Sequence, residues 1–419
     1  MTPETLGFLL MAVSFVVTMA VYPLVLSFAR KHHIVDNPNA RKLQRVPVPV
    51  MGGTTVFIGL IVAVAFGLIL APGPNPLIVL ALLTVMYLTG VWDDLADVSP
   101  FLRFLIEIIV VWMIILLLNM EINDFHGLWG LHGVPDVVSV PLSVVAGVGI
   151  MNAVNLIDGV DGYCSSYGIM TCIVFAIIFY YAGDMPMFTL ALIVIGALVP
   201  FFFHNVFGKS SKMFLGDGGS LLLGTVLAIF TFSALSSNSA CADYGDEGLS
   251  LVALTLSILA VPVFDTLRVM VVRVLKGNSP FHPDKTHLHH LFIEMNFSHL
   301  ATSAIIVSVN AIIVLILLLC WRLGASINVQ VYVVIALALL FTWAFYFFME
   351  REHRKNDGDG SALFQRWCKH GKASNLSGSR LWLFIRKVVD SKLLAGSSEP
   401  KDTPQTSTEP GKRIDPRIS

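Results

Sequence analysis

The sequence carries little charge. Asp, Glu, Lys and Arg make up only 13% of its 419 residues, about half the share found in soluble proteins. That shortage excludes an ordinary soluble globular protein. Apolar runs of about 20 residues recur instead, and each could cross a hydrocarbon core of about 30 Å. The short alternating segments of a transmembrane barrel are missing. The sequence therefore predicts an all-α polytopic membrane protein.

Three further absences narrow the possibilities. The five cysteines show no CxxC spacing, which gives no support to a disulfide framework or a zinc ribbon. A formal net charge of −1 gives no indication of a nucleic-acid partner. The start has neither a basic n-region nor a small-residue cleavage site, so the first apolar run is expected to remain as a span.

The apolar pattern predicts about 11 transmembrane helices, of which the fifth and sixth have the weakest pattern. The predicted spans are Leu6–Phe28, Met51–Ala71, Pro76–Trp92, Phe101–Leu118, Val137–Val154, Tyr167–Tyr181, Met185–Phe203, Ser220–Ser236, Leu249–Leu267, Ala301–Cys320 and Val329–Met349.

The loop charges orient these spans. Basic residues gather in the loops after the first and ninth spans: Arg30, Lys31, Arg41, Lys42, Arg45, Arg268, Arg273, Lys276 and Lys285. Two loops on the other side are acidic and hold Glu121, Asp124, Asp136, Asp243, Asp246 and Glu247. The positive-inside rule then predicts an external N-terminus, with the basic loops in the cytosol.

The chain divides into two predicted regions, a transmembrane catalytic domain over 1–349 and a cytosolic tail over 350–419. The end of the tail is rich in Ser, Thr, Pro and charge, so the tail is expected to be largely disordered. The stretch "SRLWLFIRKVVDSKLL" mixes apolar and basic residues. It predicts either an amphipathic helix on the membrane surface, or an ordinary soluble helix or frayed end.

Four polar motifs lie at the predicted cytosolic ends of the spans, and their shared side predicts one common site. They contain Asp93, Asp94 and Asp97; Asn152, Asn155, Asp158 and Asp161; Asp217 and Ser220; and His282, Asp284, His287, His289 and His290.

The carboxylates of the first motif favour a cation. In a helix, Asp93 and Asp97 would share a face, and like charges that close repel each other. Mg²⁺ would resolve this cost, since it binds one or two carboxylates together with substrate phosphates. The alternative is a solvated acidic helix end.

Glycines mark the second and third motifs, "NLIDGVDG" and "FLGDGGS". Glycine allows tight turns and close backbone approach. A Gly-rich turn before a helix can offer free N–H groups to phosphate, with Ser220 as a cap and Asp217 holding a metal. A plain polar turn is the alternative for each.

The fourth motif is a histidine-rich loop. A zinc site is conceivable, but no cysteine supports it, and imidazoles beside lysine also suit phosphate recognition. A solvated loop is the alternative. Combined, the motifs favour phosphoryl transfer, with one substrate arriving from the cytosol and the other from the bilayer. A secondary transporter is the competing class, although the acids gather at one face and no inverted repeat is visible.

The ordered motifs resemble those of the polyprenyl-phosphate N-acetylhexosamine-1-phosphate transferases. They are "NARKLQRVPVPVMGG", "GVWDDLADVSP", "NAVNLIDGVDG", "HNVFGKSSKMFLGDGGS" and "VPVFDTLRVMVVRVLKGNSPFHPDKTHLHH". The resemblance implies transfer of a sugar 1-phosphate from a UDP-N-acetyl sugar to undecaprenyl phosphate, with release of UMP. It also implies a need for Mg²⁺, or Mn²⁺ in its place.

Within that family, "HLHH" is similar to the GlcNAc-1-phosphate transferases (the WecA type) that start O-antigen and enterobacterial common antigen synthesis. Phospho-N-acetylmuramoyl-pentapeptide transferase, the alternative, usually has three consecutive histidines and ten spans. The resemblance further implies UDP-GlcNAc as donor, a bacterial inner-membrane location, a site on the cytosolic face, and a homodimer.

The resemblance also assigns roles to residues. Asp217 matches the metal ligand, Asp93 and Asp94 the pair near the lipid phosphate, and Asp158 and Asp161 the pair in the nucleotide pocket. The expected catalytic residues are Asp93, Asp94, Asp158, Asp161 and His287. The expected substrate-binding residues are Lys42, Asn155, Asn205, Phe214, Arg268, Arg273, His289 and His290. Our hypothesis is a single displacement in which Asp93 or Asp94 takes the residual proton of the lipid phosphate. The rival is a two-step route with an aspartate nucleophile.

Overall fold

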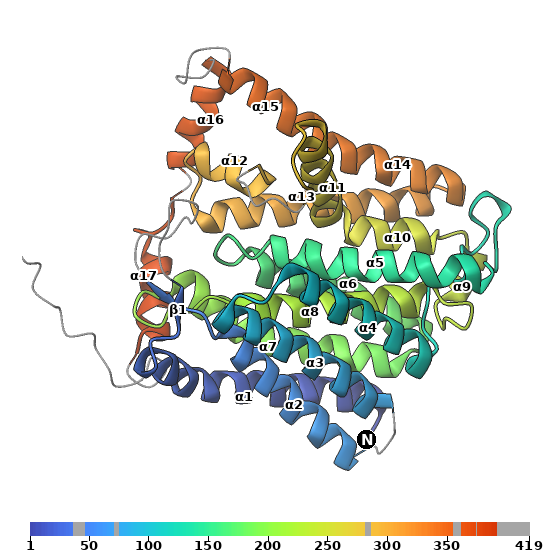
Figure 1. The fold of residues 1–419 in the computed structure, drawn as a ribbon, viewed down its shortest axis with the longest axis horizontal. Helices are drawn as coiled ribbons and strands as arrows, with labels where there is room; N and C mark the ends of the chain where they lie inside the picture. The colour runs from blue at the N-terminus through green and yellow to red at the C-terminus, as the bar shows by residue number, and fades with distance from the viewer. Residues whose placement is uncertain (37–46, 71–74, 281–285, 355–361, 374, 392–419) are drawn as a thin grey trace, which may run out of the picture.

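Long helices make up nearly all of the structure, a computed structural model that describes residues 1–36, 47–70, 75–280, 286–354, 362–373 and 375–391 (Figure 1). The helices are α1 Pro3–Lys31, α2 Gly52–Leu70, α3 Asn75–Ala96, α4 Pro100–Leu118, α5 Asp136–Leu156, α6 Tyr163–Ala182, α7 Met185–Phe207, α8 Gly216–Leu235, α9 Ala242–Asp246, α10 Leu251–Ile258, α11 Ala260–Leu275, α12 Leu288–Glu294, α13 His299–Arg322, α14 Ile327–Leu339, α15 Phe345–Arg354, α16 Ala362–Ala373 and α17 Arg380–Val389. A π-helical turn, Leu340–Ala344, joins α14 to α15. Two short antiparallel strands, β1 Val35–Asp36 and β2 Val48–Pro49, complete the elements used below.

The described residues contain ten helices long and apolar enough to cross a membrane. In Figure 1 they lie side by side and run back and forth along one common direction. This confirms the predicted all-α polytopic class. The fifth and sixth predicted spans, which had the weakest sequence pattern, are the continuous helices α5 and α6.

The ninth predicted span, Leu249–Leu267, is broken into α10 and α11. Pro262 lies in the first turn of α11 and has no N–H to donate, which favours a break there. Asn310 satisfies the freed backbone groups: its Oδ1 accepts from the N–H of Val261 at 3.0 Å, and its Nδ2 donates to the carbonyl of Ile258 at 2.9 Å. Figure 1 shows α11 nearly end-on, whereas α10 follows the bundle. The break therefore turns α11 away from the direction of its neighbours.

Helix α8 is the centre of the bundle. Its spanning window is entirely buried, and it packs against α3, α5 and α2. Close approach to α3 depends on Gly90, where an added Cβ would lie 2.3 Å from the carbonyl oxygen of Asp217. Because α8 begins at Gly216, its N-terminal turn lies where the polar motifs meet.

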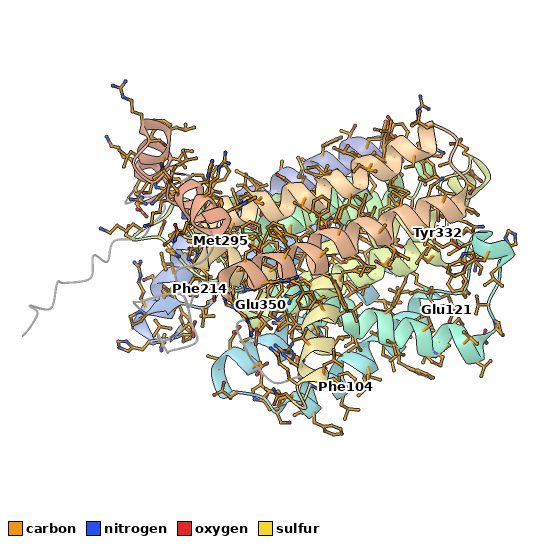
Figure 2. The ribbon with its side chains drawn as sticks, turned by 90° about the horizontal axis from the view of Figure 1, so that it is seen from above. Phe104, Glu121, Phe214, Met295, Tyr332 and Glu350 are labelled. Carbon is orange, nitrogen blue, oxygen red and sulfur yellow. The ribbon has the colours of Figure 1, made fainter. Side chains whose placement is uncertain are left out.

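The two ends of the bundle differ. Figure 2 shows Phe214 and Met295 toward one end and Glu121 and Tyr332 toward the other. We call the end with Phe214, β1, α12 and α17 the site end. Glu121, from a predicted acidic outer loop, lies at the opposite end. The loop charges predicted this separation of the acidic loop from the polar motifs.

Candidate functional site

The N-terminus of α8 is bound by carboxylates. Both oxygens of Asp94, on α3, accept backbone N–H groups, from Asp217 at 3.0 Å and from Gly218 at 3.1 Å. Asp158, in the turn after α5, accepts the N–H of Gly216 at 3.1 Å. Carboxylates suit this position because the free N–H groups and the helix dipole favour negative charge.

This arrangement corrects one expectation. The turn before α8 does not offer its N–H groups freely to phosphate, because Asp94 and Asp158 already occupy them. The expected cap, Ser220, lies one turn inside the helix and donates its hydroxyl to the carbonyl of Gly216 at 3.1 Å. The helix begins at Gly216, earlier than the predicted span, and Gly216 has a left-handed backbone angle, φ 76°.

Arg103, at the start of α4, is the cation among these acids. Its Nη1 donates to Asp93 Oδ2 at 3.1 Å and lies 3.7 Å from Asp217 Oδ2. Its Nη2 donates to the side-chain oxygens of Asn152 and Asn155, at 3.0 and 2.9 Å. One guanidinium thus contacts the first three polar motifs, which is what its five donors in a planar fork allow.

Glu107 and Asn155 complete this network. Glu107 is 0% exposed and accepts from Nε of Arg103 at 3.1 Å, while Asn155 donates to Asp217 Oδ1 at 2.7 Å and to Ser220 at 2.9 Å. The sequence interpretation missed Arg103 and Glu107. Two ionisable residues four apart in an otherwise apolar span were the available signal, since such residues are rare there and usually functional.

Asp97 does not join the cluster. Helix α3 ends at Ala96, and Asp97 is exposed with a left-handed backbone, φ 46°. The expectation that Asp93 and Asp97 share a helical face is therefore wrong. Asp93 instead accepts the N–H of Val98 at 2.9 Å and closes the end of the helix.

Asp161 forms a second centre, in the turn between α5 and α6. Its Oδ2 lies 2.6 Å from Nζ of Lys212 and 2.9 Å from Nδ1 of His299. Burial alone would raise the pKa of Asp161, but the hydrogen bond and charge of His299, with those of Lys212, outweigh it and lower the pKa. Asp158, three residues earlier, differs: burial raises its pKa, and the carboxylates of Asp217 and Asp94 raise it further. His299 lies outside every motif, and no sequence signal identified it.

The Lys212→Met variant is expected to lose about 1.5–3 kcal/mol of unfolding free energy at pH 7, the range for a hydrogen bond to a charged group. Because the pKa of Asp161 is depressed in the folded state, the pair stabilises fully above the unfolded-state value, about 3.9. That contribution is lost as pH falls through the folded-state pKa. Unfolding of the purified protein in detergent, followed from pH 7 to pH 3, measures it.

Lys209→Met is the matched control for this prediction, since the Lys209 side chain is exposed on the same loop. It should behave like the unaltered protein at every pH. A stability difference for Lys212→Met that persists unchanged at the lowest pH would contradict the assignment of the pair.

The histidines are held by an aspartate that the sequence interpretation did not single out. Asp265, on α11, accepts from His287 Nδ1 at 3.0 Å and from the N–H of Leu288 at 3.1 Å. It also accepts from Nη2 of Arg268 at 2.7 Å. Arg268 is 0% exposed and its guanidinium lies 3.5 Å from the ring centre of Tyr346. Arg268 therefore stabilises the histidine loop through Asp265, which binds both Arg268 and His287.

His289 brings this loop to the turn after α5. A Cβ added at Gly159 would lie 3.0 Å from its Nε2, and its ring is stacked 5.7 Å from that of His287. Burial lowers the pKa of His289, and the neighbouring His290 and His287 lower it further. His289 is therefore a neutral imidazole at pH 7. The His290 ring lies 4.3 Å from that of His289.

The remaining predicted site residues lie around these centres. Asn205 accepts the N–H of Gly162 at 2.6 Å and donates to the carbonyl of Met213 at 2.9 Å. It therefore joins the turn between α5 and α6 to the loop between α7 and α8. Phe214 lies beside Lys212, whose Nζ is 5.5 Å from the ring centre. Arg273 donates to the carbonyl of Pro280 at 2.7 Å. Lys42, His282 and Asp284 lie outside the described residues.

The cluster fits a hard divalent cation that is partly held by substrate. Within the described residues, no three His, Cys, Asp or Glu side chains converge closely enough to hold a metal by themselves. Mg²⁺ does not need such a cage, because it uses one or two carboxylates and completes its shell with phosphate and water. Asp217, with a side chain 36% exposed, is more open to such a ligand than Asp93, at 14%.

Comparison of the sequence with known proteins identifies a family and relatives of this chain. Residues 76–235 match the model of glycosyl transferase family 4. The chain is 31% identical over 296 residues to the probable undecaprenyl-phosphate N-acetylglucosaminyl 1-phosphate transferase of Bacillus subtilis (strain 168), covering 68% of this chain and 77% of that protein. It is 29% identical over 279 residues to the undecaprenyl-phosphate alpha-N-acetylglucosaminyl 1-phosphate transferase of Escherichia coli O157:H7, covering 64% and 72%. The protein of the same name from Yersinia pestis is 28% identical over 312 residues, covering 72% and 81%.

Proposed function

Because this chain belongs to glycosyl transferase family 4, we propose that it transfers N-acetylglucosamine 1-phosphate from UDP-GlcNAc to undecaprenyl phosphate and releases UMP. The names of its relatives support this donor and acceptor. The product would start a polysaccharide of the O-antigen or enterobacterial common antigen type. The positive-inside rule, applied to the loop charges of the sequence, supports a cytosolic site in the bacterial inner membrane. A homodimer stays a prediction.

The observation that carries the proposal is the convergence at the start of α8. Asp94 and Asp158 accept N–H groups of its first turn. Arg103 donates to Asp93 and lies 3.7 Å from Asp217, the second residue of the helix. Acids outnumber bases there, so the site is suited to a divalent cation and to the phosphates that accompany it. Its position at the end of the spans would let a lipid phosphate in the bilayer meet a water-soluble nucleotide sugar.

The nucleophile needs little activation. A phosphate monoester has a second pKa near 6, so most of the lipid phosphate is already dianionic at pH 7. In our proposal Arg103 orients that phosphate beside Asp93, which takes the residual proton. Asp94 holds the turn of α8 in place, since its two oxygens already accept backbone N–H groups. The oxygen of the lipid phosphate then forms a bond to the β-phosphorus as UMP leaves.

The donor would be held by the second centre and the histidines. Lys212 and the neutral His289 can donate to the diphosphate. Asn205 joins the turn that holds Asp161 to the loop that holds Lys212. When bound at Asp217, Mg²⁺, or Mn²⁺ in its place, would neutralise charge on the diphosphate, which is the main catalytic need in phosphoryl transfer.

We expect the purified protein, supplied with Mg²⁺ and undecaprenyl phosphate, to release UMP faster from UDP-GlcNAc than from UDP-GalNAc or UDP-MurNAc-pentapeptide. Release measured for each donor tests the sugar, and omission of the lipid is the control. Preference for the pentapeptide donor would replace our proposal with the peptidoglycan reaction. If no donor led to UMP release, the transferase proposal would fail and the secondary transporter would remain as the alternative.

The single displacement has its own test. A rapid quench after one turnover with sugar-labelled donor should recover label only in donor and lipid product. Label bound covalently to the protein would instead establish the two-step route with an aspartate nucleophile.

A further inference from the structure

The C-terminal tail contacts the loop that leads into the site. Helix α17 begins at the N-cap Ser379, which accepts the N–H of Trp382 at 3.2 Å, and ends at Asp390. Figure 1 shows α17 against the site end of the bundle. Nε of Arg386 donates to the carbonyl of Phe207 at 3.2 Å, and the Trp382 ring lies 4.7 Å from the Phe207 ring. The tail is thus docked on the end of α7.

The side chain of Asp390 binds main-chain N–H groups of the loop between α7 and α8. Its carboxylate accepts the N–H of Lys209 at 3.0 Å, the N–H of Ser211 at 2.9 Å and the hydroxyl of Ser211 at 2.8 Å. Burial alone would raise the pKa of Asp390, but these donors outweigh it and lower the pKa. The carboxylate therefore stays ionised near neutral pH and accepts three donors at once.

The loop from Gly208 to Leu215 is anchored residue by residue, and Asp390 supplies the first anchors. Arg30 donates to the carbonyl of Ser210, and the Tyr22 hydroxyl donates to that of Ser211 at 2.8 Å. The next residue is Lys212, which meets Asp161 at 2.6 Å. The loop then passes through Met213 and Phe214 to Gly216, the first residue of α8.

We propose that Asp390 is a positioning residue of the transferase site: it holds the main chain of Lys209–Ser211 and thereby places Lys212 for the nucleotide sugar. The C-terminal segment 375–391 would then contribute to binding of the nucleotide sugar. This inference rests on the proposed function, since it concerns binding of the donor. It does not rest on the identity of the sugar.

Three variants and one control test the proposal. Asp390→Ala removes all three contacts, and Asp390→Asn retains one acceptor oxygen. A chain that ends at Asn375 lacks α17 and Asp390. A chain that ends at Ser391 keeps both and lacks only the residues after Ser391. The truncation at Ser391 is the matched control and should match the full chain.

Two measurements read out the variants. In Asp390→Ala and in the chain ending at Asn375, the KM for the donor should rise by about tenfold to a hundredfold, as expected when a contact residue is misplaced, with a smaller change in kcat. Asp390→Asn should recover part of this loss. Amide hydrogen exchange at Lys209 and Ser211 should be at least about tenfold faster in Asp390→Ala, because the N–H groups lose their acceptor.

The outcomes separate this inference from the proposed function. Unaltered KM and unaltered exchange in Asp390→Ala would overturn it, and so would faster exchange with an unaltered KM. If Asp390→Ala does not fold, the same two readouts on Asp390→Asn and on the chain ending at Asn375 decide. If the full chain releases no UMP with any donor, the proposed function fails, whereas the exchange result still tests whether Asp390 holds the loop.

Discussion

Asp217→Asn is expected to lower kcat/KM by about a thousandfold, the scale on which single electrostatic groups act in transition states. The substitution keeps the shape of the side chain, and its amide oxygen can still accept from Asn155, 2.7 Å away. What it removes is the negative charge, and with it the proposed ligand of the divalent cation. Mg²⁺-dependent binding of UDP should be lost together with turnover.

Two measurements check this result: UMP release over a range of Mg²⁺ concentrations, and calorimetric binding of UDP with and without Mg²⁺. Asp97→Asn is the control, because Asp97 is exposed at a left-handed position that asparagine also tolerates. Its kinetics should equal those of the unaltered protein. Retention of Mg²⁺-dependent UDP binding by Asp217→Asn would remove Asp217 from the metal site.

Arg103→Met is expected to cost about 3–5 kcal/mol of unfolding free energy, the usual penalty for removing one partner of a buried ion pair. Arg103 is 16% exposed at its side chain, and its partner Glu107 only 1%. Without the guanidinium, Glu107 is left as a buried charge, and Asp93 and Asp217 lose their cation. Activity should fall below detection.

A second substitution separates stability from chemistry. In Arg103→Met with Glu107→Gln, the buried charge on α4 is gone, so much of the lost stability should return. Activity should not return, because Asp93 and the lipid phosphate still lack a cation. Denaturant unfolding in detergent and UMP release are the two readouts. Recovery of activity in the double variant would show that Arg103 serves only to balance Glu107.

The spans and the shared end of the motifs were predictable because both follow from hydropathy and loop charge, which are properties of the chain read in order. The contacts within the site were not. That the start of α8 meets Asp94 depends on the close approach of two helices at Gly90, and no periodicity encodes that register. The break in the ninth span was equally hidden, because its compensation comes from Asn310, on another helix.

The roles of charged residues show the same limit. Arg103 and Asp265 each lie within an apolar run, which was a signal that the sequence interpretation missed. Their contacts could not be predicted, because several of their partners come from distant segments. His299 carried no signal, since a single histidine at the start of a helix is common. The site roles of Lys42, His282 and Asp284 stay predictions, because these residues lie outside the described part of the chain.

The meeting of Asp94 with the first turn of α8 also bears on how the chain is made. Asp94 is synthesised 123 residues before the N–H of Asp217 that it accepts. At usual translation rates that interval lasts roughly 6 to 25 s. Throughout it Asp94 lacks the helix terminus that it binds in the finished fold. We therefore expect the end of α3 to stay at the aqueous boundary of the bilayer, where water can solvate the carboxylate, until α8 has been inserted beside it.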